Sequence, residues 1–188
     1  MNPIFLEPET VFGGKNSLRS IAAPIMKKLS AATGESTALF VIDNMKCICM
    51  AREVGSSRLV YTINEGDYME LYPTASGRVL LAYADDEFTD KLLEQSELKR
   101  FTAATVVDKD DIKKELLAIR ERGYSINKEE REQGIAAIAA PIFDFENKVP
   151  AALAIVGPVH RFNDENSREM LAALLSTTRE MSRLMGES

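Results

Sequence analysis

The 188-residue sequence contains little of the chemistry on which many enzymes and metal sites depend. It has one histidine, His160, and two cysteines, Cys47 and Cys49, which cannot form a zinc site without heavy help from carboxylates. The motifs G-x-S-x-G, G-x-x-x-x-G-K-[ST] and G-x-G-x-x-G are absent. No apolar run approaches the length of a membrane span, and no basic, apolar leader opens the chain. We therefore expect a cytoplasmic protein with no cofactor, no metal and no membrane partner.

Positive charge is also in short supply. Lysine and arginine number 23 against 29 aspartates and glutamates, which gives a net charge of −6. A domain that holds nucleic acid through its overall field carries clustered positive charge, so this chain by itself is a poor candidate for binding DNA. Hydrophobic residues make up 45% and charged residues 28%, as in ordinary globular proteins, and the length predicts one domain.

The rare nucleophilic and titratable side chains favour structural roles. Cys47 and Cys49 stand two apart in an apolar stretch, where a strand directs both side chains to one face. Redox pairs usually have two intervening residues, so we interpret these cysteines as buried structural thiols, with a redox or metal role as the alternative. His160 stands near Pro158 and Phe162 and is interpreted as a solvated loop residue.

Hydrophobic periodicity predicts several helices. Apolar residues at steps of three and four predict an amphipathic helix from Ser17 to Gly34, in which Pro24 either produces a kink or marks a later start. A second helix, capped by Thr74 or Ser76, reaches Tyr83. Further helices are expected at Glu87–Gln95, Asp108–Gly123 and Asp164–Gly186, with Asp108 and Asp164 as the caps of the last two.

Short apolar stretches predict strands at Thr37–Asp43, Lys46–Glu53, Arg58–Ile63, Tyr124–Ile126, Ile135–Phe143 and Val149–Val156. The first three form an antiparallel meander, and a polar turn joins the last two. Gly66–Pro73 is expected to be a loop. The charged stretches Asp108–Lys114 and Lys128–Glu132 alternate in sign, which predicts solvated surface. The order of elements indicates an α+β fold whose antiparallel sheet is flanked by helices.

Three segments of the sequence occur together in a specific order. They are Glu65–Asp67 leading into Leu71–Ala82, Arg120–Ser125 followed by Glu129, Glu130 and Gly134–Pro141, and Ala151–Pro158. In this order and spacing they resemble the C-terminal effector-binding domain of the IclR family of bacterial transcriptional regulators, over about residues 17 to 186. The resemblance implies a GAF-like (profilin-like) fold, in which a curved antiparallel sheet flanked by helices holds a pocket for a small metabolite.

The resemblance also implies how such a domain is used. Family members carry an N-terminal winged helix-turn-helix that binds operator DNA, and residues 1–16 are too short to hold one. We expect residues 1–16 to be a linker or the remnant of a connecting helix, and residues 17–186 to form the effector-binding domain. The family pattern further implies a homodimer or tetramer with no enzyme activity. Its effector shifts the DNA-binding state of the full-length protein.

A physical argument independently predicts a ligand site at residues 74–78. A helix start offers unpaired N–H groups and the positive end of the helix dipole, which together can hold a carboxylate. The small residues Ala75, Ser76 and Gly77 bring this backbone close to a ligand. The alternative is a Thr or Ser cap that serves only the helix.

The family pattern, carried over position by position, implies the other walls of the pocket: Arg58, Tyr61, Asn127, Ile135, Ala137, Ala154 and Val156. For Ile135, Ala137, Ala154 and Val156, the alternative is that they belong to the ordinary core of the sheet. In the family, an acidic residue is frequent at the position of Asn127 and a cysteine at that of Ala137. Serines are frequent at the positions of Ala154 and Val156. We therefore predict a less polar pocket and a carboxylate effector with an apolar or aromatic body that stacks near Tyr61.

Two other functions stay open at the level of the sequence. One is a small hydrolase that uses Ser76 as nucleophile and His160 as base, although no orienting partner for the histidine is recognisable. The other is a dimerisation module whose core is closed near Ala75 and Tyr61.

Overall fold

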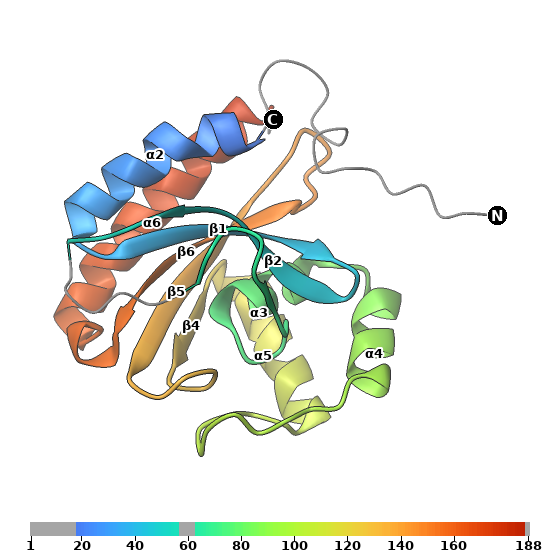
Figure 1. Ribbon diagram of the computed structural model, residues 1–188. Coiled ribbons are helices and arrows are strands. Elements are labelled where there is room, and N and C mark those ends of the chain that lie inside the picture. The colour runs from blue at the N-terminus through green and yellow to red at the C-terminus, as the bar shows by residue number, and fades with distance from the viewer. Residues whose placement is uncertain (1–17, 57–62, 187–188) are drawn as a thin grey trace.

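The computed structural model describes residues 18–56 and 63–186. Its centre is a curved six-stranded antiparallel sheet in the order β3-β2-β1-β6-β5-β4 (Figure 1). The strands are β1 (Ser36–Asp43), β2 (Lys46–Glu53), β3 (Tyr68–Met69), β4 (Ser125–Lys128), β5 (Ile135–Ile142) and β6 (Ala151–Pro158). The helices are α2 (Leu18–Thr33), α3 (Ala75–Tyr83), α4 (Asp86–Gln95), α5 (Lys109–Arg122) and α6 (Asp164–Leu184), with a short 3-10 turn at η1 (Val159–Arg161). The predicted α+β class with a helix-flanked antiparallel sheet is confirmed.

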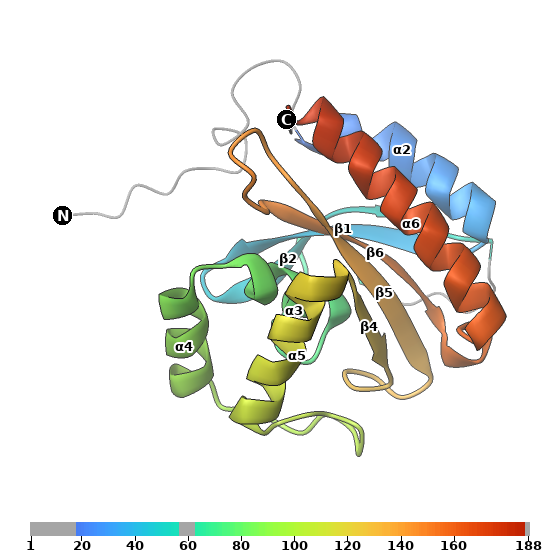
Figure 2. The same cartoon turned by 180° about the vertical axis from the view of Figure 1, so that it is seen from behind.

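Helices cover both faces of the sheet. Helices α2 and α6 lie side by side on one face, while α3, α4 and α5 gather on the other (Figure 2). Each face buries its own hydrophobic core, because successive side chains of a strand point to opposite faces. In β6, for example, Leu153 and Ile155 belong to the core under α2 and α6, whereas Ala154 and Val156 belong to the core under α3.

The small residues of β5 and β6 determine how closely α3 can approach the sheet. Ala137 pairs with Val156, and Ala139 pairs with Ala154, across the two central strands. All four are on the α3 face. Because alanine side chains project little from a sheet, this face leaves room for a helix start and a pocket beside it.

Several predicted boundaries differ from the structure. Tyr68–Met69, expected within a loop, forms the edge strand β3, because it pairs with Cys47 and Ile48 of β2. The expected strand Arg58–Ile63 lies outside the described residues except for Ile63. Pro24 lies inside the continuous helix α2 and does not mark a later start.

The caps of the helices follow the predictions except at α6. Thr74 and Asp108 cap α3 and α5 through their side-chain oxygens, and Gly123 ends α5 in the left-handed conformation. The cap of α6 is Asn163, whose side chain accepts a hydrogen bond from the Asn166 amide, and not Asp164. Asp164 instead places its negative charge in the first turn, where it favours the helix dipole. Within the described residues, no helix combines the length and apolarity needed to cross a bilayer.

Candidate functional site

A pocket lies between the start of α3 and the β5–β6 part of the sheet. Its cavity volume is about 40 Å³, well below the about 300–1,000 Å³ of typical small-molecule sites. The lining is Phe40, Met69, Pro73, Thr74, Ala75, Ser76, Asn127, Arg131, Glu132, Ile135, Ala136, Ala137, Ala154 and Val156. Most of these side chains are apolar, so the pocket suits a ligand whose body is apolar.

The first turn of α3 presents backbone donors to this pocket. The Thr74 side chain accepts a hydrogen bond from the Gly77 amide at 3.1 Å, and the Thr74 carbonyl accepts one from the Arg78 amide. No described residue accepts a hydrogen bond from the amides of Ala75 and Ser76. These two N–H groups are therefore available to an anion at the positive end of the helix.

Gly77 supports this turn from behind and does not line the pocket. A Cβ atom at Gly77 would lie 2.1 Å from the Leu71 carbonyl oxygen and 2.5 Å from Thr74 Oγ1. Only glycine therefore lets the helix start close against the preceding turn. The close packing gives Gly77 a structural role in the turn, and its contact with a ligand stays a prediction.

Asn127 joins two loops at the edge of the pocket. Its side-chain amide donates to the Pro73 carbonyl at 2.8 Å, and its Oδ1 accepts from the Glu130 amide at 3.3 Å. The side chain is 5% exposed, so these bonds are sheltered from water. Asn127 therefore fixes the turn that precedes α3 against the segment that follows β4.

The structure brings most of the predicted site residues together. Seven of the ten line the one pocket: Ala75, Ser76, Asn127, Ile135, Ala137, Ala154 and Val156. Gly77 lies directly behind them, and Arg58 and Tyr61 lie outside the described residues. The dimerisation module with a core closed near Ala75 and Tyr61 stays an alternative, because the cavity beside Ala75 is small and Tyr61 lies outside the described residues.

Six further lining residues were not predicted from the sequence: Phe40, Met69, Pro73, Arg131, Glu132 and Ala136. Phe40 shares the α3 face of the sheet with Ala154, a relation that depends on the pairing of β1 with β6. Met69 reaches the pocket through its pairing with Cys47 in β2. The alternation of side chains along β1 could have indicated Phe40, whereas the charged run around Arg131 carried no signal for a pocket.

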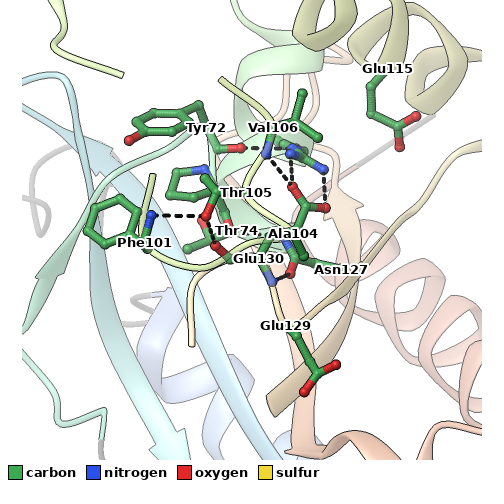
Figure 3. Close-up of polar contacts among 12 residues, drawn as sticks. Tyr72, Thr74, Phe101, Ala104, Thr105, Val106, Glu115, Asn127, Glu129 and Glu130 are labelled. Carbon is green, nitrogen blue, oxygen red and sulfur yellow. Dashed lines mark hydrogen bonds and ion pairs between the residues drawn. The ribbon is translucent and has the colours of Figure 1, made fainter. Parts of the chain in front are cut away.

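The segment after β4 is held by a buried ion pair (Figure 3). Arg78, 3% exposed, donates from Nε to the Tyr72 carbonyl at 2.8 Å and forms a two-pronged pair with the Glu130 carboxylate. Thr105 donates to the Glu130 carbonyl at 2.6 Å. The prediction that Lys128–Glu132 is solvated surface is therefore wrong at Glu130, because a carboxylate with a bidentate arginine partner can be buried.

The two cysteines are buried thiols, as predicted. Burial raises the pKa of Cys47 to about 12 and that of Cys49 to about 11, since the thiolate would lose its hydration. Both side chains belong to the core under α3, and the Cys47 sulfur lies 3.9 Å from Ser76 Oγ. In the described part of the chain, no three His, Cys, Asp or Glu side chains form a cluster that could hold a metal ion.

Ser76 and His160 show none of the features of a nucleophile and its base. The Ser76 hydroxyl is buried and faces the Cys47 sulfur. His160 is exposed in η1, after the end of β6, as the loop interpretation predicted. The described residues provide no hydrogen bond between the two side chains.

Comparison with known families identifies the domain. Residues 14–183 match the family described as "Bacterial transcriptional regulator IclR C-terminal". The chain belongs to this family. The matched family and its relatives are transcriptional regulators and not enzymes, which agrees with the non-catalytic role expected from the resemblance and leaves the hydrolase alternative without support.

The curated relatives are longer than this chain. It is 34% identical over 161 residues to the HTH-type transcriptional regulator KdgR of Dickeya chrysanthemi, covering 86% of this chain and 53% of the relative. It is also similar to regulators such as BhcR of Paracoccus denitrificans, at 28% identity over 97% of this chain and 65% of the relative. The chain thus spans about half to two thirds of the length of these proteins.

Solved structures share the fold. The Thermotoga maritima IclR structure superimposes with a TM-score of 0.87 at 30% identity, covering 92% of this chain and 70% of that one. A second neighbour is the inducer-binding domain of the PobR transcription factor from Acinetobacter, a double mutant in complex with 3-hydroxybenzoic acid. It has a TM-score of 0.82 and 27% identity, and the match covers 88% of this chain and 98% of that one.

Proposed function

We propose that this chain is the effector-binding domain of a regulator, and that a small carboxylate with an apolar or aromatic body occupies the pocket beside α3. The observation that carries the proposal is the pair of unpartnered amides at Ala75 and Ser76, which face a pocket of mostly apolar lining. The carboxylate accepts from these amides, and the apolar body packs against Phe40, Ile135 and Val156.

The character of the lining favours an acid with few hydroxyl groups. Ala137, Ala154 and Val156 offer no hydrogen-bonding side chain, and the amide of Asn127 is already engaged with Pro73 and Glu130. Each ligand hydroxyl placed against these residues would lose its bonds to water without replacement. The PobR neighbour, which holds an aromatic carboxylic acid in its inducer-binding domain, supports the same class of ligand.

The effect on the regulator is a shift of population. A ligand changes the DNA-binding state of the full-length protein only to the extent that it binds one arrangement of domains better than another. We place the DNA-binding part outside residues 17–186, with residues 1–16 leading to it, and we propose that the domain works as a homodimer or tetramer. Helix α3 is the sensing element, because it packs on both α5 and the sheet.

Filling the pocket tests this proposal. Ala137→Leu extends a half-buried side chain into the pocket, whereas Ala137→Ser leaves the space open. Overpacking costs about 1–3 kcal/mol, so we expect Ala137→Leu to weaken benzoate binding about 5- to 150-fold by isothermal titration calorimetry. Ala137→Ser is expected to bind as the parent chain does.

Benzoate, 3-hydroxybenzoate and gluconate form the ligand series for the same titration. Both aromatic acids are expected to bind and to raise the melting temperature, since a ligand that binds only the folded state stabilises it. Stabilisation by gluconate alone, or benzoate affinity that survives Ala137→Leu, would contradict the proposed site.

A further inference from the structure

Arg131 carries a guanidinium group that the protein leaves without a hydrogen-bond acceptor. Its Nε lies 3.4 Å from Glu70 Oε2, an ion-pair distance, but the two atoms do not form a hydrogen bond. No described residue accepts a hydrogen bond from the rest of the group. The side chain is 35% exposed and only its Nε is buried, so the other N–H donors of the guanidinium are available to a ligand.

The position of Arg131 is nevertheless well defined. Its guanidinium carbon lies 4.1 Å from the centre of the Phe101 ring, a cation–π contact that fixes the plane of the group. Its neighbour Glu130 is anchored by Arg78 and Thr105 (Figure 3). On the other side, the Gly134 amide donates to Glu129 Oε1 at 2.8 Å and closes the loop. A side chain held in this way is pre-organised for a ligand.

Arg131 also stands where a ligand would meet it. It lines the pocket together with Ala75 and Ser76, and it lines a second hollow on the surface with Phe101 and Gln133. Arg131 therefore lies where the pocket and this surface hollow meet. The other charged residue of the pocket lining, Glu132, is exposed.

We infer that Arg131 is a specificity-determining residue, which binds a second carboxylate on the ligand while the α3 amides hold the first. This inference rests on the proposed function, because it assigns the outer end of the same ligand. The planar fork of a guanidinium matches a carboxylate and forms charge-assisted, two-pronged hydrogen bonds. The preferred effector is thus a dicarboxylate with a short apolar or aromatic body.

The test compares acids that differ only in the second carboxylate. Calorimetric titrations use benzoate against terephthalate and hexanoate against adipate, with the parent chain, Arg131→Gln and Arg131→Lys. In at least one pair, we expect the dicarboxylate to bind the parent chain about tenfold or more tightly than the monocarboxylate, the scale of one charge-assisted contact. Arg131→Gln is expected to abolish this preference. Arg131→Lys keeps the positive charge but lacks the planar guanidinium, so we expect it to retain part of the preference.

Arg122 supplies a matched control. Its guanidinium carbon lies 5.3 Å from the centre of the Tyr124 ring, and its Nη2 forms an ion pair with Glu115, but Arg122 does not line the pocket. Arg122→Gln is expected to preserve the preference for the dicarboxylate. Two results overturn this inference and leave the proposed function standing. One is a preference for the dicarboxylate that persists in both Arg131→Gln and Arg131→Lys. The other is a parent chain that binds the monocarboxylates but shows no preference for the dicarboxylates. Failure of all four acids to bind the parent chain removes the proposed function as well.

Discussion

Arg78→Met is expected to lower the free energy of unfolding by about 3–5 kcal/mol. Arg78 is 3% exposed, and its partner Glu130 has a side chain that is 12% exposed. Removal of the arginine leaves the Glu130 carboxylate largely buried without its counter-charge and leaves the Tyr72 carbonyl without its donor. Because whole domains are stable by about 5–15 kcal/mol, this loss is large. Urea denaturation of the parent and variant chains measures it.

The double variant Arg78→Met with Glu130→Met is the control for this prediction. Replacing both members of a buried pair by apolar groups of similar volume removes the uncompensated charge, so we expect it to recover a large part of the lost stability. A change below about 1 kcal/mol in the single variant, the range of an exposed ion pair, would show that the pair is solvated and that it does not anchor the loop.

Gly77→Ala is expected to lower the free energy of unfolding by about 3 kcal/mol or more, which is the upper end of the cost of overpacking. The new methyl group would lie 2.1 Å from the Leu71 carbonyl oxygen, which is backbone and cannot rotate away. The start of α3 must shift, and the hydrogen bond from the Gly77 amide to Thr74 is lost with it. This loss outweighs the gain of about 1 kcal/mol in helix propensity when glycine becomes alanine.

Thr74→Ala separates the cap from the steric effect, because it removes only the side-chain acceptor, at about 1 kcal/mol. Chemical denaturation should therefore rank Gly77→Ala below Thr74→Ala in stability, and titration with benzoate should show weaker binding to Gly77→Ala, since its amides are displaced. If Gly77→Ala is as stable as the parent chain and binds benzoate equally well, the close packing at this turn is disproved.

The arrangement of helices and strands could be predicted well from the sequence because the relevant signals are local. Thr74 and Asp108 cap helices by accepting from amides a few residues away, Gly123 ends α5 within the same stretch of chain, and the continuous apolar runs of β5 and β6 are visible in the sequence itself. The two exceptions have different causes. Asn163 and Asp164 are both good caps, and the short edge strand at Met69 exists only because β2 pairs with it.

The site was only partly predictable because much of it is assembled by contacts distant in sequence. The amides of Ala75 and Ser76 follow from the helix start, and the family resemblance supplied Asn127 and the small residues of the sheet. Glu130 was missed because its burial depends on Arg78, 52 positions earlier. Arg131 was missed because an alternating charge run is usually solvent-exposed, and nothing in the run reveals that Phe101 lies beneath the guanidinium.

Amide NMR during a titration with benzoate tests the central claim most directly. If the α3 amides hold the carboxylate, the N–H signals of Ala75 and Ser76 shift together, in proportion to the bound fraction. The Asp110 and Asp111 amides at the start of α5, which already donate to the Asp108 side chain, stay in place. Binding of benzoate with unchanged Ala75 and Ser76 signals would contradict the account.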